Sequence, residues 1–170
     1  MPIARIRPAR PVRPAAPALP SFADLDETHR QILQILANLE RLPDLLMQPD
    51  GGQEAAALAA RACSFFGGAA RSHHETEETL VFPSLLETAD AELRNHVQRL
   101  QQDHNWFEED WLELEPHLQA VAQGWREEHV AFLRAALPEF TALQHEHIAL
   151  EESLIYPEAK RRQAAFGAPA

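Results

Sequence analysis

The sequence predicts an all-α protein built as an up-down-up-down four-helix bundle. Three observations support this fold class. Apolar residues recur every three or four positions over four long stretches. Alanine, leucine, glutamate and glutamine dominate, while glycine occurs 6 times in 170 residues. The chain has no period-two alternation and no Asn-Gly turn signal, so we expect no sheet. Such helices, joined by short connections, pack as a bundle.

The first 20 residues differ in composition from the rest of the chain. They hold six prolines, four arginines and no acidic residue. This proline spacing forbids a helix and favours an extended polyproline II chain. We therefore divide the chain into a Pro/Arg-rich tail over 1–20 and a helical body over 21–165. We expect the tail to be solvated or to lie along the acidic body; a partner-binding arm is the alternative.

The first helix is predicted over 21–42. Ser21 is a suitable N-cap, with Asp24 three positions later. Pro43 should end this helix, because proline cannot donate the helical hydrogen bond. The stretch QPDGG at 48–52 reads as a loop.

The second helix is predicted over 53–87, with Pro83 near its end. Gly67 and Gly68 fall in its middle. A glycine pair at such a place indicates close packing against a neighbouring helix, or a mild kink.

The third helix is predicted over 89–114, where Pro116 should end or bend it. The fourth is predicted over 125–163. We expect a break or kink just before Pro138, and a bend of the last turns at Pro157.

A segment of 11 residues occurs twice. Residues 73–83 read HHETEETLVFP, and residues 147–157 read HIALEESLIYP, at an offset of 74 positions. His29 on the first helix corresponds to His104 on the third, at an offset of 75 positions. The chain therefore reads as two helical hairpins related by a pseudo-two-fold axis.

The repeat places ionisable residues at one level of the bundle. Within each copy, His and Glu are four positions apart and share one helix face. Distances counted from the connecting turns bring His29 and His104 to a matching level. The apolar residues around them indicate that this level is buried. The predicted metal ligands are His29, His73, Glu77, His104, His147 and Glu151.

Burying six ionisable groups without partners would cost a prohibitive amount of free energy, and bound metal would offset that cost. Imidazole and carboxylate suit iron, manganese, zinc or cobalt. Two carboxylates at the pseudo-two-fold axis could each bridge two ions. That set leaves positions for an oxo or hydroxo bridge and for a small exogenous ligand. A ferritin-type site is disfavoured, because it needs Glu-x-x-His and no histidine here has Glu three positions before it.

The remaining candidates carry less weight. We expect His74 and His145 to point away from the predicted site. Glu78 and Glu152, next to the predicted ligands, should be supporting or surface residues. Glu108, four positions after His104, is the best candidate for a seventh ligand. Structural or surface roles are expected for His96, His117 and His129.

Composition limits the partners. The net charge is −11, so we expect no binding to nucleic acid. No segment approaches the roughly 18 apolar residues of a membrane span. One cysteine, Cys63, excludes an internal disulfide, fits a reducing cytoplasm and reads as a buried filler. The sequence leaves monomer and homodimer open.

These motifs resemble the hemerythrin-like (HHE cation-binding) family over roughly residues 21–160. The resemblance rests on His29, on HHETEETLVFP, on QQDHNWFEEDW at 101–111 and on HIALEESLIYP. It implies a four-helix bundle with a non-haem, oxo-bridged di-iron centre held by the six residues given above. Manganese or zinc would also suit these ligands.

The chain departs from the oxygen-carrying hemerythrins, in which the third helix carries HxxxH and the fourth HxxxxD. Glu108 stands where the extra histidine would be. The four-His two-Glu set is closer to relatives implicated in nitric-oxide responses, peroxide handling, iron sensing and iron–sulfur cluster repair.

Three functions therefore remain open. The first is a di-iron protein that binds O2, NO or peroxide for sensing, storage or stress handling. The second is a di-iron oxidoreductase acting on peroxide or nitric oxide, so whether the protein is an enzyme stays undecided. The third is an interaction module in which the metal only staples the bundle.

Overall fold

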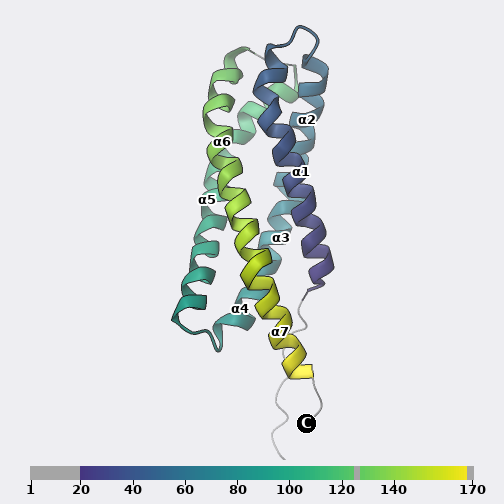
Figure 1. The fold of residues 1–170 in the computed structure, drawn as a ribbon. Helices are drawn as coiled ribbons and strands as arrows, with labels where there is room; N and C mark the ends of the chain where they lie inside the picture. Colours follow the sequence, from purple (N-terminus) through teal and green to yellow (C-terminus); the bar gives the residue numbers. More distant parts are fainter. Residues whose placement is uncertain (1–19, 125–126, 168–170) are drawn as a thin grey trace, which may run out of the picture.

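The computed structural model describes residues 20–124 and 127–167, and these contain helices and no strand (Figure 1). The predicted all-α four-helix bundle is confirmed. The predicted tail over 1–20 lies outside the described residues, except for Pro20. Within the described residues, no helix is both long and apolar enough to cross a membrane.

Four long helical rods run alternately up and down the bundle (Figure 1). The first rod is α1 and the third is α5. The second and fourth are interrupted by short π-helical segments. In chain order the elements are α1 (Phe22–Met47), α2 (Gly52–Phe65), η1 (Phe66–Ala70), α3 (Arg71–Thr76), η2 (Glu77–Val81), α4 (Phe82–Leu86), α5 (Ala91–Ala122), α6 (Glu127–Leu150), η3 (Glu151–Ile155) and α7 (Tyr156–Gly167).

Side-chain caps begin two of the rods. Ser21 accepts a hydrogen bond from the Asp24 backbone N–H at 3.4 Å, as the sequence indicates. Asp90 accepts one from the Leu93 N–H at 2.9 Å and begins α5. Each cap satisfies a backbone donor that has no partner within its helix.

The predicted end of the first helix at Pro43 is wrong, because α1 continues through this residue. The helices α5 and α6 likewise continue through Pro116 and Pro138, so these prolines do not end them, and the alternative of a bend or kink stays a prediction. A proline inside a helix costs about 3 kcal/mol. The turn that follows Pro43 buries Leu45 and Leu46. Full burial of one leucine contributes about 1.5–3 kcal/mol, so packing offsets the lost hydrogen bond.

Close packing at Gly67 and Gly68 is also not found. A Cβ atom added to either residue would meet nothing within 4 Å. Both glycines lie in η1, where the helix widens by about one residue. The structure therefore shows a π-helical segment at this pair, in place of close packing against a neighbouring helix.

The interior has two apolar clusters separated by a polar layer. One cluster, which includes Leu36, Leu118 and Leu133, fills the end near the α1–α2 loop. The other, which includes Leu85, Leu100 and Ile155, fills the end near α4 and α7. Along every rod, the buried histidine of the polar layer stands between members of the two clusters.

Candidate metal centre

The structure brings the six predicted ligands together in the polar layer, which we call the metal centre. All are buried, with side chains at most 8% exposed. They form two groups of four, in each of which the potential ligand atoms lie within 4.8 Å of one another. The first group is His29, His73, Glu77 and Glu151; the second is His104, His147, Glu77 and Glu151.

Each carboxylate belongs to both groups through different oxygen atoms. Glu77 places Oε1 3.5 Å from His73 Nε2 and Oε2 3.5 Å from His104 Nε2. Glu151 places Oε2 3.2 Å from His29 Nε2 and Oε1 3.3 Å from His147 Nε2. Ligands about 2.1 Å from one ion are separated by about 3.0–3.4 Å, so these spacings suit coordination.

Two of the π-helical segments, η2 and η3, begin at these two glutamates. In η2 the Phe82 N–H donates to the Glu77 carbonyl, and in η3 the Tyr156 N–H donates to the Glu151 carbonyl. Both bonds span five residues, as in a π-helix. The next residue in each copy is proline, which cannot donate the α-helical bond. The shared ending of the repeat therefore accounts for the widened turn beside each carboxylate.

In three of the four histidines, His29, His104 and His147, the ring nitrogen Nδ1 lies near a carboxylate outside the six predicted ligands. His29 Nδ1 lies 3.1 Å from Glu152 and His104 Nδ1 lies 3.0 Å from Glu78. These contacts are related by the pseudo-two-fold axis, and each links two helices. A proton held on Nδ1 leaves Nε2 with a free lone pair, the state that a metal ligand requires.

Asp103 and Tyr156 are supporting residues that the sequence did not reveal. Asp103 Oδ2 lies 3.4 Å from His147 Nδ1. The Tyr156 hydroxyl donates to Glu77 Oε1 and lies 3.2 Å from His29 Nε2. Tyr156 could have been found from the repeat, because it aligns with Phe82 and differs from it by a hydroxyl group. Asp103 carried no spacing signal, because its partner comes from another helix.

Burial disfavours two charges side by side at this centre. The pKa of Glu77 lies well above its ordinary value because the side chain is buried and Glu151 is nearby. Burial alone would raise the pKa of Glu151 too, but His147 and His29 outweigh burial and hold it well below the ordinary value. Without metal, burial and the neighbouring charges therefore favour a proton on Glu77 over a proton on Glu151.

The two histidines of the repeat differ in their protonation. Burial, with His29 close by, lowers the pKa of His73 to about 3. Burial would also lower the pKa of His147, but the charges of Glu151 and Asp103 raise it to about 9. In the metal-free protein at pH 7, His73 is therefore neutral and His147 is protonated.

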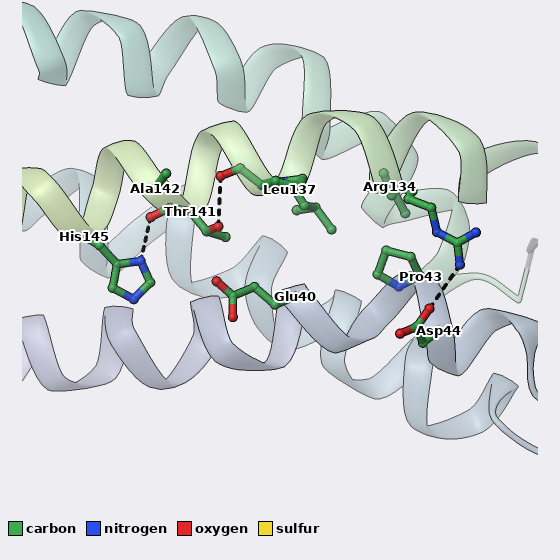
Figure 2. A pocket seen from close by; sticks show the side chains of 10 residues that line it. Glu40, Pro43, Asp44, Arg134, Leu137, Thr141, Ala142 and His145 are labelled. Carbon is green, nitrogen blue, oxygen red and sulfur yellow. Dashed lines mark hydrogen bonds and ion pairs between the residues drawn. The ribbon is translucent and has the colours of Figure 1, made fainter.

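The prediction that His74 points away from the site is wrong. Its ring stacks on His104 with centroids 4.3 Å apart, and it is 9% exposed. One of its nitrogens lies within 4.8 Å of nitrogens of His104 and His147. A bundle helix buries an arc at least 100° wide, so consecutive residues can both face inward. His145 does lie elsewhere, in a groove between α1 and α6 (Figure 2).

Glu108 is not placed as a seventh ligand. Its carboxylate lies at the surface and forms a two-bond ion pair with Arg71, with an Arg71 Nε–Oε1 distance of 2.9 Å. His117 and His129 lie 3.0 Å apart, beside Phe132 and away from the metal centre. Cys63, predicted to be buried, is only partly buried, and this burial raises the pKa of its thiol to about 11, which disfavours the reactive thiolate.

The donor atoms fit metal ions. Among the described residues, several buried atoms of the centre have no hydrogen-bond partner: both ring nitrogens of His73, Oε2 of Glu77 and both oxygens of Glu151. Unsatisfied buried polar groups cost about 1–3 kcal/mol each, and more when charged. Imidazole nitrogen and carboxylate oxygen are ligands of first-row divalent ions, which would satisfy one ring nitrogen of His73 and the carboxylate oxygens.

Comparison with known proteins agrees with this geometry. The model of the hemerythrin HHE cation-binding domain matches residues 21–159. The chain is 28% identical over 126 residues to an uncharacterized protein of Haemophilus influenzae, an alignment that covers 74% of this chain and 71% of that protein. No solved structure matches the chain.

Proposed function

The chain belongs to the hemerythrin HHE cation-binding domain family, and from this premise we propose that it holds two iron ions and binds a small ligand such as O2, NO or peroxide. Its role would be sensing, storage or the handling of iron and oxidative stress in the cytoplasm.

The division of the carboxylate oxygens is the observation that carries the proposal. Glu77 and Glu151 each direct one oxygen to the first group and the other to the second. A single ion would need only one group of four. Two groups that share both carboxylates favour two ions: His29 and His73 would help to hold one, His104 and His147 the other, and Glu77 and Glu151 would serve both.

Iron is the proposed metal because the ligands combine imidazole with carboxylate, and because the hemerythrin-like resemblance implies it. Manganese and zinc suit the same ligand types. When bound, iron would supply redox chemistry and a position for a small ligand.

The protein's own residues control access and charge. The ligand side chains are nearly inaccessible to solvent, so only small molecules could reach them. The Tyr156 O–H bond to Glu77 and the Asp103 contact to His147 orient the donor groups. Such supporting contacts tune metal affinity and reactivity.

The test is anaerobic purification with iron, followed by metal analysis and near-ultraviolet absorption on exposure to air. We expect two irons per chain and charge-transfer bands that disappear in His73→Ala. His145→Ala, which removes an exposed histidine of α6, should keep both. Zinc without a spectral response would support a structural metal instead. Catalytic turnover of peroxide or NO would identify the oxidoreductase alternative.

A further inference from the structure

A groove runs along the surface between α1 and α6 (Figure 2). Its floor is apolar, because it is formed by the buried side chains of Pro43, Leu133 and Leu137. The space inside the groove is about 500 Å³. Clefts that bind ligands have about 300–1,000 Å³, so this groove is large enough to hold a short segment of polypeptide.

The rim of the groove offers hydrogen-bond acceptors. Glu40 and Asp44 stand one helical turn apart on α1. Asp44 accepts a hydrogen bond from Arg134 of α6 at 3.0 Å, whereas Glu40 is exposed and bonds none of the described residues that line the groove (Figure 2). His145 Nδ1 donates to the Thr141 carbonyl at 2.7 Å, so Nε2 of the neutral ring is an acceptor. The rim thus carries two carboxylates against one guanidinium.

The Pro/Arg-rich tail over 1–20 has a three-residue repeat, which solubility alone does not require. Arginine stands at positions 7, 10 and 13, and proline at 8, 11, 14, 17 and 20. A polyproline II chain has three residues per turn, so the arginines share one edge of such a chain and the prolines another. The chain can therefore present arginines to carboxylates and prolines to an apolar floor at the same time.

Charge favours the body of the same chain as the surface that the tail contacts. The tail carries four arginines and no acidic residue, and without these arginines the net charge of −11 becomes −15. A segment joined to its target by a short linker has an effective concentration in the millimolar range. Contacts that are weak one by one therefore suffice to hold the tail on the body.

The tail is long enough to reach the groove. Pro20 lies two residues before α1, and Glu40 follows 20 positions later, which is about 30 Å along the helix. An extended polyproline II chain covers that distance in about ten residues. A tail that turns back along α1 therefore brings Arg10 level with Glu40, with Arg7 and Arg13 one turn to either side.

We propose that residues 7–14 of the tail, RPARPVRP, bind in the α1–α6 groove of their own chain. The proline edge contacts the apolar floor, and the arginine edge faces Glu40 and Asp44. Glu40 is the first partner of an incoming arginine, because Asp44 already pairs with Arg134. This inference does not depend on the metal centre, and it gives the tail a defined surface, whereas charge alone predicts only a general attraction to the acidic body.

The first test measures a distance in the full-length protein. Spin labels are attached at Ala9→Cys in the tail and at Ala135→Cys, an exposed position of α6 outside the groove, in a Cys63→Ser background. Double electron–electron resonance should give one narrow distance distribution. An unbound chain would place residue 9 on average only about 18 Å from Pro20, short of the groove, and would give a broad distribution. A broad distribution would overturn the proposal.

The second test exchanges charges between the tail and the groove. Arg10→Glu and Glu40→Lys should each broaden the distribution at least twofold, and the two together should restore the narrow one. Glu113→Lys is the matched control, because it changes the net charge equally but lies on α5, outside the groove. Equal broadening by Glu113→Lys, or no restoration in the double variant, would overturn the proposal.

A mixture of two singly labelled proteins, one at position 9 and one at position 135, decides which chain supplies the tail. We expect no defined distance in this mixture. A narrow distribution would assign the groove to the tail of a second copy and would overturn binding within one chain. Circular dichroism should show the same helix content in every variant, since the substitutions lie in the tail or at exposed positions, apart from Cys63→Ser, which all of them share.

Discussion

The repeat at 73–83 and the repeat at 147–157 lie on different hairpins, and each presents one histidine and one carboxylate to the metal centre. In both copies the carboxylate begins a π-helical segment. In both, the following glutamate, Glu78 or Glu152, contacts a histidine of another rod. The features common to the two copies are therefore those that place donor atoms.

The supports of the two copies differ. Tyr156 of the second copy has a hydroxyl that bonds Glu77, whereas its counterpart Phe82 has none. Asp103 contacts His147, whereas the Nδ1 atom of His73 has no partner among the described residues. The two copies therefore present the same donor residues, but the polar residues that contact those donors differ. The two groups of ligands are chemically distinct for this reason.

The largest expected effect comes from removing a carboxylate that both groups share. If the centre holds the two ions proposed above, Glu77→Gln should reduce bound metal to less than one ion per chain, whereas His29→Gln should leave one, because His29 belongs to only one group. The amide is close in size to the carboxyl and carries no charge, so the variant should fold. Elemental analysis after desalting measures the difference. Glu108→Gln is the control, and two ions retained in Glu77→Gln would contradict the shared role.

The next effect tests the asymmetry at the aromatic position. Tyr156→Phe makes the second copy match Phe82 in the first. Loss of the bond to Glu77 should weaken metal binding about 10–100-fold while both ions remain measurable at saturation. Competition with a chelator gives the affinities. An affinity equal to that of the wild type would mean that the hydroxyl does not tune the centre.

A smaller effect should follow pH. In the metal-free protein His147, with a pKa of about 9, holds a proton at pH 7, and burial beside Glu151 raises the pKa of Glu77. A metal must displace the protons held on its ligands, so the affinity for Mn²⁺ should rise about tenfold per pH unit for each proton released. Calorimetry in buffers of different ionisation enthalpy counts them.

The same protonation has the opposite effect on the stability of the metal-free protein. Because folding raises the pKa of His147, its contribution is complete below pH 6.5 and is lost as pH rises through about 9. For metal binding, an affinity that falls between pH 7 and 9 would contradict the proton release expected above.

The smallest effect concerns the glycine pair, whose counterparts in the second half are Thr141 and Ala142. Changing Gly67 and Gly68 to alanine should raise the free energy of unfolding by about 0.5–1 kcal/mol each, because added Cβ atoms meet nothing. Gly124→Ala should instead destabilise by about 1–2 kcal/mol, because its φ is 96°. Urea unfolding midpoints measure both, and a destabilised double variant would show that the π-helical segment needs glycine.

Prediction from the sequence succeeded where the signal lay within one helix. The apolar period predicted the four rods, and Ser21 the start of the first. The four-residue spacing of His and Glu predicted that their side chains would share a face. The offset of 74 positions predicted that two such faces would meet, and the structure brings the six residues together. Their role as metal ligands remains a prediction.

What the sequence by itself determined is thus the helical fold class and which six histidines and glutamates come together, because the first follows from local periodicity and the second from the repeated spacing. Only the tertiary structure decided which side chains meet across helices: Asp103 with His147, Tyr156 with Glu77, and Asp44 with Arg134 across one groove. It also decided that α1 continues through Pro43. These outcomes depend on the rotation and axial offset of one packed helix against another. Packing of many side chains sets those quantities, and no spacing along a single chain records them.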